Sequence, residues 1–175
     1  MSTSDDITWT GVFTPTINIE DASNILTLSS SYTDLAGNAG PSAVTANYTI
    51  DTLAPTISSI TPSWGSYLNS TEDNSDGTVT IATTNVEDGQ TLTIGLNSVN
   101  YTGSISNNTV TITISATNLQ ALTDGITYTI TANVSDIIGN IATQGTTTFI
   151  YDITHPLVSS FTMSDTALKI GDTST

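Results

Sequence analysis

One residue pattern occurs twice in this chain and limits what the chain can fold into. The first copy reads Asp34-Leu35-Ala36-Gly37-Asn38, continues through a strand-like segment, and ends at Asp51-Thr52-Leu53-Ala54-Pro55. The second copy has Asp136-Ile137-Ile138-Gly139-Asn140 followed by Asp152-Ile153-Thr154-His155-Pro156. The copies lie roughly 101 residues apart, which is about one domain length. The repeat therefore predicts a tandem array with a unit boundary near each Pro.

Residues 54–152 have the pattern of a complete β-sandwich. Short segments rich in Val, Ile, Thr and aromatic residues alternate with turn residues at the spacing typical of sandwiches, and only residues 117–121 suggest a single helical turn. The predicted strands are residues 56–61, 78–84, 91–97, 99–105, 109–115, 126–134 and 145–151. We therefore expect an all-β fold, with one seven-strand immunoglobulin-like β-sandwich at its centre.

The two flanking segments are too short to close a sandwich of their own. Residues 1–53 predict strands over 7–14, 24–32 and 42–50 with a loop over 19–24, and we interpret them as the C-terminal half of a unit. Residues 153–175 predict one strand over 158–163 and are interpreted as the start of a further unit. No signal-peptide pattern follows Met1, so we expect the chain to be a window from a longer array.

Composition narrows the possible partners. The sequence has sixteen acidic residues against one basic residue, which makes a formal net charge of −15, and it has no Cys. Such a chain repels nucleic acid and anionic membranes, so we expect neither as a partner. Charged residues make up only 10% of the chain, and the β-branched residues that recur throughout distinguish it from a disordered acidic tail.

Several strings, taken together, resemble a known family. They are Trp9-Thr10-Gly11-Val12-Phe13-Thr14-Pro15, Asn24-Ile25-Leu26-Thr27-Leu28, Glu87-Asp88-Gly89-Gln90, Leu119-Gln120-Ala121-Leu122-Thr123-Asp124-Gly125 and Asp165-Thr166-Ala167-Leu168-Lys169-Ile170-Gly171-Asp172-Thr173-Ser174, beside the two Gly-Asn loops. With these strings the chain resembles bacterial immunoglobulin-like (Big) repeats of giant secreted surface adhesins of the RTX and biofilm type. The resemblance implies secretion to the cell surface, a role as an extender in adhesion or biofilm formation, contacts with neighbouring repeats, and calcium at the joints. The terminal ligand of such an adhesin stays unknown.

Catalysis is not expected. The one His of the sequence, His155, lies in a linker before Pro156 and has no nucleophile predicted beside it. The many Asp residues formally allow a paired-carboxylate hydrolase. They fall in turns, however, where Asp is favoured for backbone reasons alone.

Strand order predicts that acidic loops meet at one end of the sandwich. The linker that enters the unit, the loop after its second strand and the loop before its seventh strand share a pole, and the preceding unit adds a corner loop. The residues so predicted are Asp51, Glu87, Asp88, Asp136, Asn140, Glu20 and Asp21. Ca²⁺ takes carboxylate and carbonyl oxygens, so these residues are a candidate Ca²⁺ site. The alternative is that Asp136 and Asn140 only shape a turn and that Asp51 only caps a strand end.

Other polar residues are weaker candidates. Asp152 and Asp34 occupy the equivalent positions at the two neighbouring joints, and each is predicted to be half of a similar metal site. The acidic loop of residues 72–76 is interpreted as a solvated connection, since its spacing does not fit an EF-hand.

Three aromatic residues are informative: two bear on an alternative function and one on the fold. Trp64 and Tyr67, in the long connection after the first strand, would grip a glycan or protein if both were exposed, whereas burial of Trp64 favours a spacer. Tyr128, near the start of the sixth strand, matches a tyrosine corner, in which the phenol hydrogen-bonds back across the preceding loop. The simpler alternative is that Tyr128 is a core aromatic.

Overall fold

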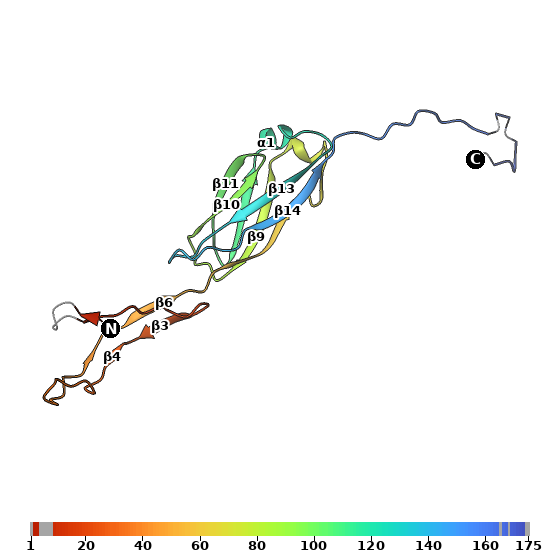
Figure 1. Cartoon of the computed structure of the whole chain (residues 1–175). Helices are drawn as coiled ribbons and strands as arrows, with labels where there is room; N and C mark the ends of the chain where they lie inside the picture. The colour runs from red at the N-terminus through yellow and green to blue at the C-terminus, as the bar shows by residue number, and fades with distance from the viewer. Residues whose placement is uncertain (1, 4–8, 165, 168, 174–175) are drawn as a thin grey trace.

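The computed structural model describes residues 2–3, 9–164, 166–167 and 169–173, and these are almost entirely β-strands and loops. A sandwich occupies the middle of the chain, short strands lie on one side of it, and an extended tail leaves the other side (Figure 1). Ile7 of the predicted first strand, and Asp165, Leu168 and Ser174 of the quoted C-terminal string, lie outside the described residues. No helix in the described part is long and apolar enough to cross a membrane.

Two sheets form the sandwich. One contains β7 (Thr56–Pro62), β9 (Gly77–Thr84) and β12 (Thr109–Ile114) in the order β12-β9-β7. The other has the order β11-β10-β13-β14-β8, with β8 at Tyr67–Leu68, β10 at Thr91–Leu96, β11 at Val99–Ser104, β13 at Ile126–Asn133 and β14 at Gly145–Tyr151. The predicted all-β sandwich is confirmed. The sequence analysis missed β8, because two residues are too few to show a strand period.

Alternation along the strands builds the core. In β9, Val79 and Ile81 are buried, while Thr80 and Thr84 between and beyond them face solvent. The same pattern in β10, β12 and β13 places aliphatic residues inside and mostly Thr outside. Phe149 of β14 is 1% exposed and meets the ring of Trp64 edge-on, with ring centroids 5.2 Å apart. This aromatic pair fills one end of the core.

Two tight turns connect successive strands of the sandwich, one within a sheet and one between the two sheets. Asn97 and Ser98 join β10 to β11 with φ of 48° and 64°, and Asn107 and Asn108, before β12, have φ of 50° and 57°. Positive φ at both central residues is the geometry of a type I′ turn, whose twist matches that of the flanking strands. Asn tolerates this backbone better than most residues with a side chain, which explains its use at both turns.

The tyrosine corner is confirmed. The Tyr128 hydroxyl oxygen accepts a hydrogen bond of 2.7 Å from the Thr123 backbone N–H. Between these residues and the preceding strand lies the short helix α1 (Ala116–Gln120), which Ser115 caps by accepting from the Asn118 N–H. The corner therefore secures the crossover from β12 to β13.

The acidic loop of residues 72–76 is only in part the solvated connection that the sequence predicted, because residues 74–76 are exposed but Asp73 is buried. Asp73, in the single 3-10 turn η1 (Glu72–Asn74), is buried and accepts a 2.7 Å hydrogen bond from the Tyr151 hydroxyl. Asp76 accepts from the backbone N–H of Ala116, at the start of α1, at 2.9 Å. The two carboxylates therefore connect the loop of residues 72–76 to α1 and to β14, at the end of the sandwich where α1 lies. The prediction was wrong for Asp73, because the polarity of a loop does not show which partners the fold supplies to each side chain.

Replacing Tyr151 by Phe is expected to remove a step of alkaline unfolding. Burial, the Asp73 hydrogen bond and the negative charges of Asp73 and Asp124 raise the pKa of Tyr151 to about 12, against 10.0 for a free phenol. The neutral phenol therefore stabilises the fold fully below pH 10.0, and this contribution is lost as the pH rises towards about 12. At neutral pH the loss of the Asp73 hydrogen bond should cost about 2 kcal/mol.

Thermal melting of the wild type and of Tyr151→Phe between neutral and alkaline pH checks this expectation. Tyr67→Phe is the matched control, because Tyr67 is 61% exposed. An equally steep alkaline loss in wild type and Tyr151→Phe would show that another group titrates.

The N-terminal segment is built of short strand pairs. β1 (Ser2–Thr3) pairs with β2 (Trp9–Thr10), β3 (Glu20–Asn24) with β6 (Tyr48–Asp51), and β4 (Thr27–Leu28) with β5 (Ala43–Val44). The predicted loop over 19–24 is therefore mostly strand, and the long strands predicted over 24–32 and 42–50 are broken into shorter pieces. The alternation of apolar residues with Thr over residues 7–14 predicts a half-buried strand. Residues 10–14 are instead exposed. Pairing of β3 with β6 and of β4 with β5, rather than the polarity of each segment, therefore decides where strands form here.

The C-terminal tail contains no strand among its described residues, so the strand predicted over 158–163 is wrong for this structure. Leu157, Val158 and Phe161 extend into solvent. The reason is that a strand needs a neighbour to take its backbone hydrogen bonds, and no described segment lies beside the tail.

Candidate functional site

Asp136 organises the loop before β14. Its Oδ1 accepts from the backbone N–H groups of Ile138, Gly139 and Asn140 at 3.0, 2.7 and 2.8 Å, and its Oδ2 accepts from Asn140 Nδ2 at 2.7 Å. The residue is only 4% exposed. Burial alone raises the pKa of Asp136, but the hydrogen bonds from the Asn140 side chain and the loop backbone outweigh it, and the pKa lies below its usual value. Asp136 is therefore a fixed, negatively charged group.

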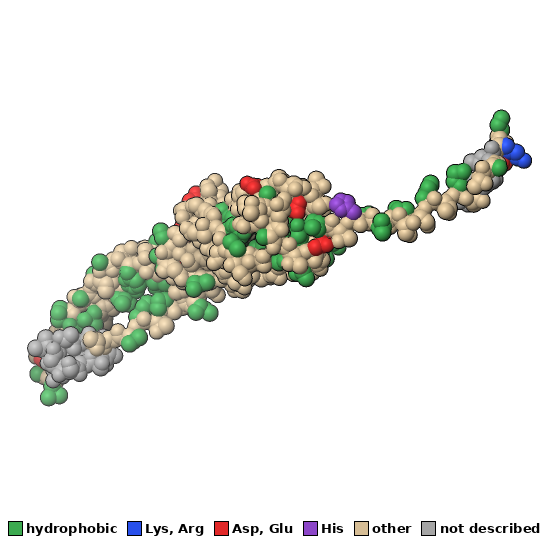
Figure 2. Space-filling model, turned by 90° about the horizontal axis from the view of Figure 1, so that it is seen from above, with side chains coloured by type: hydrophobic (Ala, Val, Ile, Leu, Met, Phe, Trp, Pro, Cys, Tyr) green, Lys and Arg blue, Asp and Glu red, His purple; other side chains and the backbone are tan. Residues whose placement is uncertain are grey.

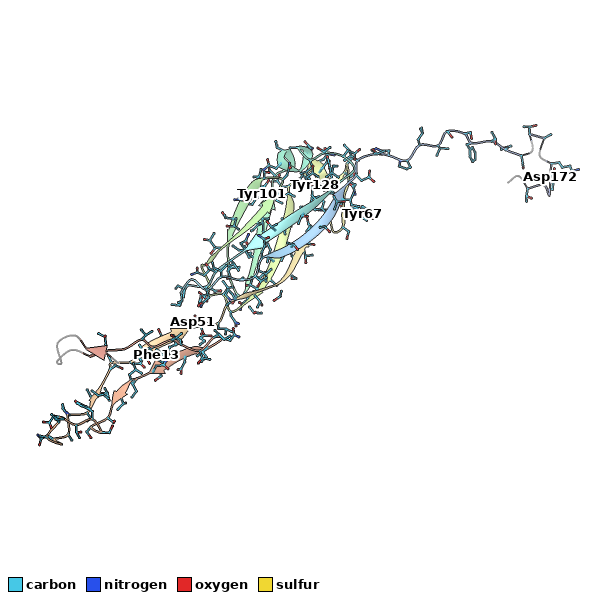
Figure 3. The ribbon with its side chains drawn as sticks, in the orientation of Figure 1. Phe13, Asp51, Tyr67, Tyr101, Tyr128 and Asp172 are labelled. Carbon is cyan, nitrogen blue, oxygen red and sulfur yellow. The ribbon has the colours of Figure 1, made fainter. Side chains whose placement is uncertain are left out.

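Asn140 connects this loop to the linker that enters the sandwich. Its Nδ2 donates to the carbonyl oxygen of Asp51 at 3.3 Å and to Asp51 Oδ1 at 3.2 Å. The same Oδ1 accepts from the Leu53 backbone N–H at 3.0 Å. The turn-shaping role of Asp136 and the strand-end role of Asp51 are both present, and the loop and linker lie side by side (Figure 3).

The loop after β9 completes this end of the sandwich. Glu87 Oε2 accepts from the backbone N–H of Ile137 at 3.0 Å, which joins the two loops. A cavity of about 210 Å³ lies among these segments, and its lining residues are Glu20, Asp51, Leu53, Asn85, Val86, Glu87, Asn108 and Asp136. We call this cavity the joint cavity. It brings together four carboxylates from the N-terminal segment, the linker and the sandwich.

Three predicted residues lie outside the lining of the joint cavity: Asn140, whose hydrogen bonds to Asp51 and Asp136 are given above, Asp88 and Asp21. Asp88 Oδ1 accepts from the Asn107 backbone N–H at 2.6 Å and so fixes the hairpin before β12. Asp21 Oδ1 accepts from the Ser23 N–H within its own turn. Conversely, Asn85 and Asn108 line the cavity and were missed by the sequence analysis. The sequence held a signal for each of them. Asn85 lies two residues before Glu87 in the same loop, and Asn108 lies in the turn Asn107-Asn108.

The oxygen atoms of the joint cavity suit a hard cation. Within the described part of the chain, no hydrogen bond reaches Asp51 Oδ2, Glu87 Oε1 or either carboxylate oxygen of Glu20. However, no three Asp, Glu, His or Cys side chains among the described residues are grouped closely enough to hold a metal ion as they stand. The donor set is thus of the right chemistry, but its side chains are spread around the cavity wall.

Asp34 repeats the Asp136 loop in an exposed setting. It accepts from the Ala36 and Asn38 N–H groups and from Asn38 Nδ2, all at 2.8–2.9 Å. The Asn38 side chain is the largest influence that lowers the pKa of Asp34. The loop of the repeat is therefore a self-contained turn that forms without a partner unit.

Asp152 lies at the opposite end of the sandwich. It lines a second cavity with Glu72, Thr154 and His155, and its Oδ1 accepts from the Thr154 N–H at 3.0 Å. Asp124 Oδ1 holds the same linker by accepting from the Ile153 N–H at 2.8 Å. The sequence analysis did not associate Glu72 or Asp124 with Asp152, because they lie in loops far apart along the chain.

The alternative function as a glycan- or protein-binding module requires that Trp64 and Tyr67 both be exposed. Trp64 is 7% exposed and packs on Phe149, so its ring is not offered to a ligand. Gly77 allows this position, since a Cβ there would lie 2.4 Å from Trp64 Cζ3. Tyr67 alone is exposed (Figure 3). By the criterion stated above, burial of Trp64 favours a spacer over a module that grips a ligand.

One segment of the chain matches a known protein family. A family model described as a bacterial Ig-like domain matches residues 1–50. No curated protein matches the chain.

Three solved structures resemble the chain. A bacterial immunoglobulin-like domain from the ice-binding adhesin of M. primoryensis is 24% identical with a TM-score of 0.41, over 56% of this chain and 95% of that one. A structure of a 1.5-MDa bacterial ice-binding adhesin, concerned with host cell surface retention, is 26% identical with a TM-score of 0.45, and a Ca²⁺-stabilized adhesin with which an Antarctic bacterium binds ice is 24% identical with a TM-score of 0.44. Each of these two matches covers 74% of this chain, which spans only 41% and 31% of their lengths. The resemblance seen in the sequence is confirmed over residues 1–50, which match the model of the bacterial Ig-like domain.

Proposed function

We propose that this chain is a non-enzymatic extender segment of an extracellular bacterial adhesin, with a joint stiffened by Ca²⁺. The three successive units of this proposal are residues 1–53, 54–152 and 153–175. The observation that carries it is the joint cavity, which Glu20 and Asp51 of one unit line together with Glu87 and Asp136 of the next. The family match of residues 1–50 supports the placement at a bacterial cell surface.

The distribution of charge supports a role at joints. All eight acidic residues of the sandwich lie outside its strands, in loops at its two ends: Glu72, Asp73, Asp76, Glu87, Asp88, Asp124, Asp136 and Asp152. The strand faces carry mainly uncharged Thr. Like charges gathered at the end of a unit repel, so a neighbouring unit would approach poorly without a cation. A divalent ion offsets this repulsion and favours one relative placement of the units.

Four side chains would hold the ion: Glu20, Asp51, Glu87 and Asp136. Ca²⁺ takes about six to eight oxygen ligands, from carboxylates, carbonyl groups and water. Because the carboxylates are spread around the wall, Glu20 and Glu87 must turn inward, while Asp136 is held in place by its loop. The ion supplies charge neutralisation and a crosslink between units, and it takes no part in a reaction.

Calcium is expected to raise the melting temperature of the wild type. Extracellular modules bind Ca²⁺ with dissociation constants of about 10⁻⁴–10⁻³ M. Ten times that concentration should therefore stabilise the chain by about 1.4 kcal/mol. Asp51→Asn and Glu20→Gln should each lose most of this gain, because each removes a charged ligand and keeps the side-chain size. A calcium titration followed by thermal melting checks this.

Asp88→Asn is the matched control for the calcium titration. Asp88 is an acid on the same loop as Glu87 but does not line the joint cavity. The proposal fails if all four proteins respond equally to calcium, or if none responds. Small-angle scattering with calcium and with a chelator tests the mechanical role separately, since chelation should broaden the distribution of interunit distances.

A further inference from the structure

One amide group contacts two carboxylates at the joint cavity. Asn140 Nδ2 donates to Asp136 Oδ2 at 2.7 Å and to Asp51 Oδ1 at 3.2 Å, and the Asp51 carbonyl oxygen lies 3.3 Å from the same nitrogen. The two carboxylate oxygens therefore lie within about 6 Å of each other, where like charges repel. The Asn140 NH2 group carries a partial positive charge, so its contact with both oxygens offsets this repulsion.

No basic side chain neutralises these carboxylates. The chain has one basic residue, Lys169, and it lies in the tail, on the other side of the sandwich from the joint cavity (Figure 2). The Asn140 amide also has an acceptor, Oδ1, which no hydrogen bond reaches within the described part of the chain. Asn140 therefore presents a donor to the carboxylates and keeps free an oxygen of the kind that Ca²⁺ takes.

The other copy of the repeated loop separates the two kinds of contact that Asn140 makes. Asn38 Nδ2 donates to Asp34 Oδ2 at 2.8 Å, just as Asn140 Nδ2 donates to Asp136 Oδ2. This bond therefore belongs to the turn itself. The contacts of Asn140 with Asp51 are additional, since they join the loop before β14 to the linker that enters the sandwich.

We propose that Asn140 is the positioning residue of the ion-free joint, where its NH2 group holds Asp51 beside Asp136 until a calcium ion displaces it. This displacement rests on the calcium site proposed above. When the ion binds, the amide turns, so that the NH2 group leaves the carboxylates and Oδ1 becomes available to the ion. The bridge keeps linker and sandwich in one placement without an ion. It also weakens calcium binding, because the ion has to break the hydrogen bonds of the NH2 group first.

A double-mutant cycle measures the bridge in the absence of calcium. With a chelator present, Asn140→Ala and Asp51→Ala should each lower the melting temperature of the sandwich. The double variant should lose clearly less than the two single losses combined, because both substitutions remove the same hydrogen bonds. Additive losses would show that the two residues act separately, which overturns the bridge.

A calcium titration of Asn140→Asp, followed by thermal melting, tests the displacement. This variant lacks the NH2 group and carries a further carboxylate, so it should melt below the wild type in chelator. It should bind calcium about tenfold more tightly than the wild type, since a charged ligand replaces a competing donor.

Asn85→Asp is the matched control for Asn140→Asp. Asn85 lines the joint cavity, so the variant adds the same charge there, but no hydrogen bond within the described residues joins Asn85 to Asp51 or Asp136. Asn85→Asp should melt like the wild type in chelator and gain less calcium affinity than Asn140→Asp.

The outcomes distinguish this displacement from the calcium joint itself. If calcium stabilises the wild type but binds Asn140→Asp no more tightly than Asn85→Asp, the displacement is overturned and the calcium joint stands. If calcium leaves the wild type unchanged, the calcium joint fails and the displacement fails with it.

Discussion

Replacing Phe149 by Ala is expected to lower the free energy of unfolding of the sandwich by about 3–5 kcal/mol. Phe149 lies in β14 between the rings of Trp64 and Tyr128, with centroid distances of 5.2 and 5.9 Å. Truncation removes both ring contacts and leaves a cavity at the end of the core, which close-packed neighbours fill only partly. Urea unfolding, followed by circular dichroism at low protein concentration, measures the change.

The matched control is the same substitution at Phe161. That side chain is 92% exposed, so its removal should leave the sandwich transition unchanged. A loss below about 1 kcal/mol for Phe149→Ala would mean that the three aromatic rings do not form a packed cluster in solution. A loss of several kcal/mol for Phe161→Ala would mean that the tail packs on its own sandwich.

Replacing Asp136 by Ala is expected to cost on the order of 3 kcal/mol when measured with a chelator present. The substitution removes the acceptor for three backbone N–H groups and for the Asn140 side chain in a buried loop. It also frees Asn140, which links the loop to Asp51. The sandwich transition should therefore weaken even without calcium, which separates the structural role of Asp136 from any role as a ligand.

Asp34→Ala is the control, because Asp34 makes the same kind of loop in the N-terminal segment, away from the sandwich. It should leave the sandwich transition unchanged. Equal destabilisation of the sandwich by both substitutions would point to a general effect of charge rather than to the loop.

The Asp136 loop should also make the sandwich sensitive to acid. Hydrogen bonds hold the pKa of Asp136 below its usual value of 3.8. The stabilisation is therefore present above pH 3.8 and is lost as the pH falls through the lower pKa of the folded state. Acid titration of stability should be shallower for Asp136→Ala than for the wild type. An unchanged acid profile would exclude Asp136 as the group responsible.

Local chemistry predicted the features that depend on neighbours in the sequence. The alternation of apolar residues with Thr in residues 126–134 indicated β13, and the pattern around Tyr128 indicated the corner that the Thr123 hydrogen bond forms. Asn97-Ser98 and Asn107-Asn108 indicated turns, because Asn tolerates positive φ. These predictions succeeded since each rests on the backbone preferences of a few adjacent residues.

Predictions about which distant side chains come together in the fold succeeded only in part. The order of strands indicated that Asp51, Glu87 and Asp136 would share one end, and all three line the joint cavity. It did not show that Asp88 turns to the hairpin at Asn107 instead. A side chain in a loop chooses among several nearby backbone N–H groups, and only the folded backbone decides which of them is closest.

The sequence by itself determined the all-β sandwich and the repeated Gly-Asn loop, because strand period and turn chemistry are local properties. The tertiary structure alone decided that Asp73 is buried against Tyr151 and that Trp64 lies in the core. Burial and distance depend on segments that lie far apart in the chain but close together in space. No pattern within one segment can specify them.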